Sequence, residues 1–263
     1  MNRGRMFWGG VLVCIGLLLL LDNLGYLGGI NVWSLIFALF LIALGIWILW
    51  GHFFRGAPES EHVSIPIESA QQSSIRFQHG AGRLFVSAGA APGVLLEGDF
   101  GGGLEVSKNL RGDLLDVRLH TPTQIFPFFW SPGFNLDWNV MLATDIPLSL
   151  NLETGASETR LDLRGLKVTK LAIKTGASST KLTLPANAGY TSATIESGAA
   201  SVDVQLPEGV AARIRSRGGL STLDMDRQKF IRSGDAFQSS DYETALNKVD
   251  LDIQMGVGSV SIR

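Results

Sequence analysis

Two different patterns of hydrophobic positions divide this chain near residue 56. Residues 6–21 carry no charged side chain, and residues 32–50 contain Ser34 as their only polar side chain. A helix that crosses a bilayer needs about 20 such residues, within a range of roughly 17–25. We therefore predict a two-helix transmembrane anchor over residues 1–55, with spans at about 6–24 and 32–50. A cleaved signal peptide is the alternative for the first segment.

The basic residues that flank the apolar segments predict their orientation. Arg3 and Arg5 precede the first segment and Arg55 follows the second, whereas the short connection contains Asp22 and no lysine or arginine. Because positively charged flanks tend to stay in the cytoplasm, both chain ends are predicted to be cytoplasmic. The expected location is the cell membrane, crossed twice, so the lipid bilayer is one expected partner.

After a linker at 56–62, hydrophobic and polar residues alternate in short runs that are separated by glycine. Period-two alternation is typical of strands with one buried face. Glycine-centred segments recur with spacings of 21, 22 and 20 residues, and looser copies occur near both ends of this part. Such repetition favours stacked units that share one core. The glycines assigned to the repeats are Gly80, Gly155, Gly176, Gly198, Gly218 and Gly256.

This pattern predicts an all-β domain over residues 63–263, built as a β-solenoid or parallel β-helix-like stack with repeats of about 21 residues. A β-sandwich of meandering hairpins is the alternative, because alternating strands and glycine turns fit both folds. In either fold, the Gly-Ala-Ser centre of a repeat supplies a bend, where small side chains let neighbouring strands approach closely. If the protein is a scaffold, self-association of its repeats is also expected.

The segment IKTGASSTKLTLP, residues 173–185, resembles a site for a nucleophilic serine or a phosphate. Its small and hydroxyl residues recur in other copies, whereas a catalytic serine is needed once, so we interpret them as structural. The four histidines show no metal-ligand spacing, and no Gly-x-Gly opens a predicted helix. We therefore predict that the protein is not an enzyme and that it has no catalytic residue, no metal site and no cofactor.

Charge and cysteine content narrow the remaining classes. The 22 lysines and arginines nearly balance the 24 aspartates and glutamates, so no broad basic field exists for nucleic acid and we predict none as a partner. The chain has one cysteine, Cys14, which excludes an intramolecular disulfide.

One segment, residues 125–138, does not follow the repeat. It concentrates aromatic side chains around Pro127, Pro132 and Gly133. One interpretation is a loop folded over the end or flank of the repeats, and the other is an exposed patch that contacts lipid or a partner protein. The candidate contact residues are Phe126, Phe128, Phe129, Trp130, Phe134 and Trp138.

The combination of the segment FWGGVLVCIGLLLLLDNLG, the Gly-Ala-Ser repeats and the ending YETALNKVDLDIQMGVGSVSIR resembles the LiaF-like family of bacterial membrane proteins. These are also described as cell-wall-active antibiotics response proteins. The resemblance implies a non-enzymatic accessory regulator of envelope stress signalling, which restrains a membrane histidine kinase or contacts another envelope-stress protein. The repeats are also similar to domains called putative adhesins, which implies an envelope scaffold or adhesin as the alternative function.

Overall fold

The computed structural model describes residues 37, 40–41, 60–122 and 136–263. The chain divides into two units, and the second, formed by Ala57–Trp130 and Phe134–Arg263, contains all the strands described below. From the first unit the structure describes Phe37, Phe40 and Leu41, which are helical and expose their apolar side chains. Within the described residues, no helix has the length and apolar character needed to cross a membrane. Apart from these three residues, the predicted spans lie outside the described part of the chain.

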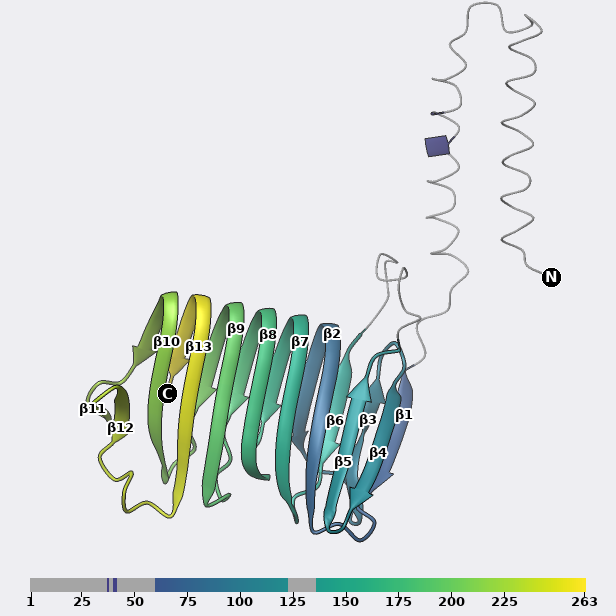
Figure 1. Cartoon of the computed structure of the whole chain (residues 1–263), viewed down its shortest axis with the longest axis horizontal. Helices are drawn as coiled ribbons and strands as arrows, with labels where there is room; N and C mark the ends of the chain where they lie inside the picture. Colours follow the sequence, from purple (N-terminus) through teal and green to yellow (C-terminus); the bar gives the residue numbers. More distant parts are fainter. Residues whose placement is uncertain (1–36, 38–39, 42–59, 123–135) are drawn as a thin grey trace, which may run out of the picture. The chain divides into compact units, whose positions relative to one another are not determined.

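Six long strands form the centre of the domain and lie side by side, every neighbouring pair being parallel. Figure 1 shows them as a row of similar arches. In their order across the sheet they are β2 (Gln72–Ala88), β7 (Pro147–Asp162), β8 (Lys167–Thr183), β9 (Tyr190–Gln205), β13 (Asn247–Ile262) and β10 (Val210–Met225). Hairpin neighbours would be antiparallel, so the alternative of meandering hairpins does not describe this centre.

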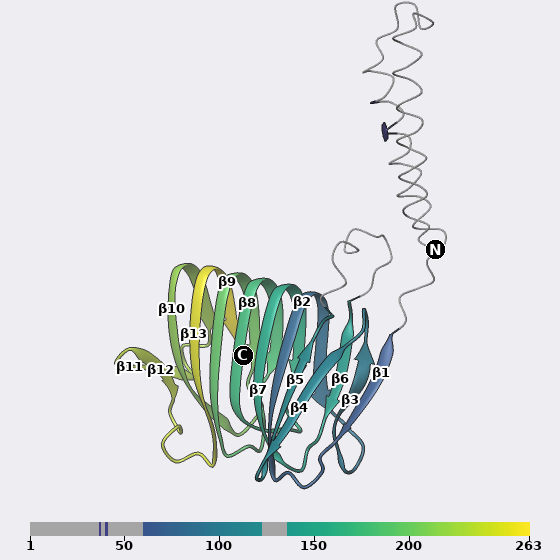
Figure 2. The same cartoon turned by 45° about the vertical axis from the view of Figure 1, so that its right-hand side comes forward.

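Each long strand curves over near its middle, so that it has a first limb, a bend and a second limb (Figures 1 and 2). Alternate side chains point inward on both limbs. In β7, Leu150 and Leu152 before the bend and Leu161 after it are all buried. The hydrophobic core is the space between the two limbs, and because each strand contributes to both walls, neighbouring strands share one continuous core.

The strand order does not follow the chain. The last strand, β13, lies between β9 and β10 and is parallel to both, which Figure 1 shows as a yellow strand between two green ones. Its Leu251 is in register with Ala193 of β9 and with Ile214 of β10. β10 is therefore the outermost long strand, although β13 follows it in sequence.

Shorter strands complete both ends of the sheet. At one end, β5 pairs with the first limb of β2 and β6 pairs with its second limb. At the other end, a short hairpin of β11 and β12 meets β10. The shorter strands are β1 (Glu61–Pro66), β3 (Val94–Phe100), β4 (Glu105–Arg111), β5 (Leu114–His120), β6 (Trp138–Leu142), β11 (Phe230–Ser233) and β12 (Ala236–Ser239).

Two boundaries differ from those expected from the sequence. The predicted linker ends at residue 62, but Glu61 and His62 already belong to β1, where they pair with Phe100 and Asp99 of β3. Strand pairing uses backbone hydrogen bonds, which do not depend on the polarity of the side chains. Polar residues assigned to the linker can therefore belong to β1. Trp138 is the first residue of β6 and is fully buried, so it is a core residue rather than a contact residue.

Candidate functional site

Glycines occupy the same position of the bend in all six long strands. The Cβ that alanine would add at Gly155 would lie 2.4 Å from the carbonyl oxygen of Gly80, and at Gly176 it would lie 3.0 Å from that of Gly155. Neighbouring backbones therefore approach so closely that a side chain would collide with the next strand. We call this row the glycine ladder, which consists, in order across the sheet, of Gly80, Gly155, Gly176, Gly198, Gly256 and Gly219.

The ladder corrects one assignment made from the sequence. Gly218 was predicted to be the repeat glycine of its segment, but Gly218 is in register with Met255, one position before Gly256. Gly219 takes the ladder position, where its Cβ would lie 3.2 Å from the carbonyl oxygen of Gly256. The two glycines are adjacent in the chain, so spacing alone could not separate them, and only the pairing with β13 does.

Hydroxyl groups fill the inside of two neighbouring bends. Ser157 donates a hydrogen bond of 2.9 Å to the hydroxyl of Thr154, and Ser178 donates one of 2.8 Å to that of Thr175. Buried hydroxyls need such partners, because an unpaired polar group inside a protein is costly. The serines of the Gly-Ala-Ser segments in β7 and β8 thus pair with their own bends, which agrees with their interpretation as structural residues.

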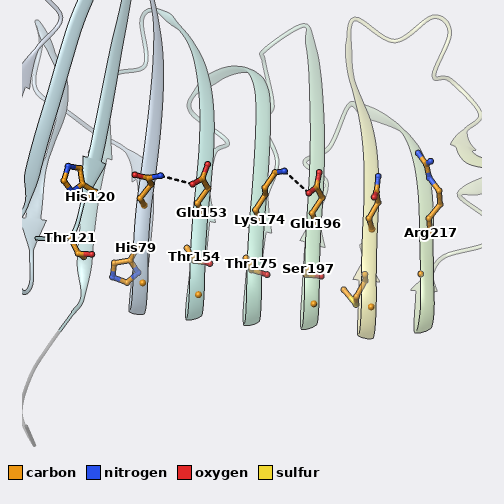
Figure 3. A pocket seen from close by; sticks show the side chains of 18 residues that line it. His79, His120, Thr121, Glu153, Thr154, Lys174, Thr175, Glu196, Ser197 and Arg217 are labelled. Atoms are coloured by element: carbon orange, nitrogen blue, oxygen red, sulfur yellow. Dashed lines mark hydrogen bonds and ion pairs between the residues drawn. The ribbon is translucent and has the colours of Figure 1, made fainter. Parts of the chain in front are cut away.

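A groove of about 1200 Å³ runs along the glycine ladder and crosses the six long strands. Its floor is formed at the bend, and one wall is formed by side chains that stand two residues before each ladder glycine, as Figure 3 shows for most of them. We call this the bend groove. Its wall residues, across the sheet from β5, are His120, Gln78, Glu153, Lys174, Glu196, Gln254 and Arg217.

The wall of the bend groove is balanced in charge, and polar contacts link two pairs of neighbouring wall residues. Gln78 donates a hydrogen bond of 2.9 Å to Glu153, and Lys174 lies 2.9 Å from the carboxylate of Glu196. Both pairs connect neighbouring strands and are drawn as dashed lines in Figure 3. Arg217 lies 2.5 Å from Asp252, beside the groove. With two acidic and two basic groups on the long strands, the wall offers alternating donors and acceptors without a net field for a polyanion or a polycation.

His79 is buried at the β2 end of the bend groove, where it forms part of the lining. Its Nε2 donates a hydrogen bond of 2.8 Å to the carbonyl oxygen of Leu136, and its ring lies 4.9 Å from that of Trp138. Burial lowers the pKa of His79 below its ordinary value of 6.5, against the opposing effects of the Leu136 carbonyl and the Asp137 carboxylate. The imidazole is therefore held neutral and fixes the chain at the start of β6.

The other residues predicted as contacts lie outside the residues that the structure describes. These are Phe126, Phe128, Phe129, Trp130 and Phe134, and their role stays a prediction. Within residues 60–122 and 136–263, no group of three His, Cys, Asp or Glu residues could hold a metal ion. The sequence interpretation missed the bend groove, although a signal was present. A polar residue stands two positions before each glycine of the ladder.

Comparison with known proteins gives the family and the fold. The family model described as the N-terminal domain of toast_rack, DUF2154, matches residues 54–205. No curated protein matches. Among solved structures, a putative cell adhesion protein from Clostridium sporogenes is 21% identical with a TM-score of 0.71, and the match covers 78% of this chain and 98% of that chain. A putative adhesin from Bacteroides fragilis is 10% identical with a TM-score of 0.28, covering 78% of this chain and 97% of that chain.

Proposed function

We propose that this chain, which belongs to the toast_rack N-terminal domain family, is a non-enzymatic scaffold protein of the cell envelope. In this proposal the β domain is a solenoid of bent repeats that binds an extended partner in the bend groove, and the N-terminal part anchors it to the membrane. The observation that carries the proposal is the continuous groove across six parallel strands. The likeness in fold to a putative cell adhesion protein agrees with an adhesive role.

The chemistry of the groove favours an uncharged polymer that is rich in hydroxyl or amide groups, such as a polysaccharide. Amide, carboxylate and cationic groups follow one another along the wall at the spacing of neighbouring strands, about 4.8 Å. A regular polymer laid across the strands can use each of them in turn. Lys174 is paired with Glu196 within the wall, and Arg217 is paired with Asp252 beside it, so a charged polymer would have to break these ion pairs.

Anchoring in the membrane is proposed from the sequence and from one structural observation. The segments 6–24 and 32–50 have the length and the apolar character of spans. The three described residues of the second segment are helical, and their large apolar side chains are exposed to water in the isolated chain. A bilayer would cover such side chains, so lipid is the partner that suits them.

The arginine distribution favours a second candidate function. It predicts the β domain in the cytoplasm, where the domain would be able to restrain a membrane histidine kinase, as the LiaF-like resemblance implies. Restraint would be a binding equilibrium, with the anchor raising the local concentration of the domain near its partner. An adhesin-like scaffold requires the opposite side of the membrane, because its polymer lies outside the cell.

Membrane topology separates the two functions. Cys14 is replaced by serine, a single cysteine is introduced as Ser233→Cys at the exposed end of β11, and intact cells are treated with a membrane-impermeant thiol reagent. The scaffold proposal expects labelling of intact cells. Protection that ends only after lysis would contradict it and favour the kinase regulator. A matched cysteine in a known cytoplasmic protein of the same cells controls for leakage.

A further inference from the structure

The outer edge of β10 is open along most of its length. On one side β10 pairs with β13 from Val210 to Met225, whereas on the other side, within the described residues, β12 meets only Arg213 and Ile214. Arg215 still approaches Asp235 in the turn of this hairpin at 3.5 Å, but after it no strand of the described chain pairs with the outer side of β10. A sheet edge of this kind is a template for pairing with another strand.

The other edges of the sheet are protected in ways that β10 is not. β1 is short, and its pairing is irregular at Pro66. β4 is also short, and every residue of it is exposed and it carries three charged side chains. By contrast, β10 presents Leu220, which is 79% exposed, and its inward-pointing Leu223 and Met225 are only partly buried. These two side chains lack neighbours on the outer side that the equivalent residues of the inner strands have.

The bent shape of β10 allows a second copy to pair with it by two-fold symmetry. The inward positions of the first limb are Ser216 and Gly218, which are in register with the buried Ile253 and Met255. Those of the second limb are Leu223 and Met225. The middle of the bend lies between residues 220 and 221. Ser216 and Met225 are equally far from this point along the chain, and so are Gly218 and Leu223. A two-fold axis through this point therefore places first limb beside second limb, antiparallel, with inward positions facing inward positions.

This register also matches opposite charges. It places Arg217 opposite Asp224 of the second copy, and Arg215 opposite Asp226. Oppositely charged side chains that face each other across neighbouring strands stabilise the pairing, and the symmetry makes each pair occur twice. Within the described residues, Asp224 has no ion-pair partner in its own chain, whereas Arg217 already approaches Asp252 at 2.5 Å.

We propose that the protein forms a symmetric dimer through the outer edges of β10, which joins two copies of the sheet into one. The hairpin of β11 and β12 leaves room for this arrangement, because its backbone pairing with β10 stops at Ile214 and the second limb of the other copy ends at Met225 and Asp226. Asp235 in the turn of the hairpin lies 3.5 Å from Arg215, so Asp226 of the second copy would share Arg215 with it. The dimer covers Leu220, Leu223 and Met225 and continues the hydrophobic core from one copy into the other. The dimer proposal does not rest on what the bend groove binds, although Arg217 belongs both to the groove wall and to the dimer contact.

Crosslinking at the symmetry axis tests the register. In the full chain with Cys14→Ser, purified in detergent, Leu220→Cys places two cysteines about 6 Å apart between Cα atoms, given the spacing and rise of neighbouring strands. This lies within the reach of a disulfide. The matched control is Val257→Cys, since Val257 is in register with Leu220 and 53% exposed but lies one strand further in. We expect mild oxidation to give at least tenfold more dimer with Leu220→Cys than with Val257→Cys.

Charge reversal tests the pairs that face each other. Arg217→Asp is expected to convert the dimer into a monomer, measured by light scattering after size-exclusion chromatography. Adding Asp224→Arg to the same chain is expected to restore the dimer, which a merely misfolded variant would not do. Equal crosslinking of the two cysteine variants, a monomeric unmodified chain, or a double variant that stays monomeric would overturn the proposal. Assemblies larger than a dimer would overturn it as well, since each copy has one β10 edge and the dimer occupies both.

Discussion

The hydroxyl of Tyr242 donates a hydrogen bond to the carboxylate of Asp250, and this contact fastens the connection before β13 to β13 itself. The same carboxylate accepts a hydrogen bond of 2.9 Å from Tyr190 of β9. On the other side, the guanidinium of Arg213 in β10 lies 4.3 Å from the centre of the Tyr242 ring. Tyr242, only 3% exposed, thus links β13 to β10, and Tyr190 joins β9 to the same carboxylate. We infer that this cluster holds β13 in its place between two strands that precede it in the chain.

Loss of the Tyr242 hydroxyl should weaken this cluster. Tyr242→Phe is expected to lower the free energy of unfolding by about 1.5–3 kcal/mol, because it leaves the Asp250 carboxylate without one of its donors. Denaturant unfolding of the full chain in detergent, followed by circular dichroism, measures the change. Tyr190→Phe is the matched control, since Tyr190 donates to the same carboxylate but is half exposed, so its replacement should cost less than about 1 kcal/mol. Equal losses in the two variants would contradict the buried cluster as the stronger contact.

The same tyrosine gives the domain a dependence on alkaline pH. Burial, and after it the hydrogen bond to Asp250, raise the pKa of Tyr242 well above its ordinary value of 10.0. Because the unfolded chain then loses this proton at lower pH than the folded chain, the stabilising contribution is complete below pH 10 and is lost as the pH rises from there toward the pKa of the folded chain. The difference in unfolding free energy between the unmodified chain and Tyr242→Phe should therefore shrink above pH 10. A difference that stays constant up to pH 12 would show that the pKa is not raised by folding.

Substitution in the glycine ladder should depend on the neighbouring strand. Gly155→Ala is expected to lower the free energy of unfolding by about 1–3 kcal/mol, because the new Cβ would lie 2.4 Å from a backbone oxygen that cannot easily move. Gly80→Ala is the matched control, since it occupies the same ladder position and its Cβ would meet nothing within 4 Å. Thermal unfolding of both variants measures the difference. Similar losses would mean that the ladder glycines are needed for their own conformation and not for close approach.

A bulky side chain in the bend groove should block binding without affecting the fold. Gln254→Trp places an indole among the wall residues, at an exposed position of β13. We expect at least tenfold weaker co-sedimentation of the detergent-solubilised chain with chitin, a neutral polysaccharide that carries hydroxyl and amide groups. Ser259→Trp is the control, because Ser259 is exposed on the same strand beyond the bend and does not line the groove. No binding by the unmodified chain, or equal loss in both variants, would reject the proposed ligand class.

Much of the repeat could be predicted from local sequence. Alternation in segments such as Leu148–Leu152 places every second residue on one face, and the buried positions in β7 follow that pattern. The repeat glycines were also placed correctly wherever one glycine stood alone, as at Gly155 and Gly176. At Gly218 and Gly219 two neighbours fit the spacing equally well. Local pattern could not choose between them, because the choice depends on which one comes against the backbone of Gly256.

The candidate site was less predictable than the fold. Gln254 and Arg217 lie on the wall of one groove although they are far apart in sequence, and they do so because their strands are neighbours. Trp138 was grouped with the aromatic residues that precede it, but its place in β6 buries it against Phe100 and His79. An aromatic residue looks the same in sequence whether it is in a core or on a surface, and long-range pairing decides between the two.

The sequence by itself determined the period of the repeat, the inward and outward faces of its strands and the position of most bends, because these depend on residues that are near one another in the chain. Only the tertiary structure decided the order of the strands. Similar repeats can pair with one another in several orders at similar cost, and the choice rests on contacts between distant segments. Tyr242 and Asp250, Gly219 and Gly256, and the insertion of β13 between β9 and β10 are all contacts of this kind.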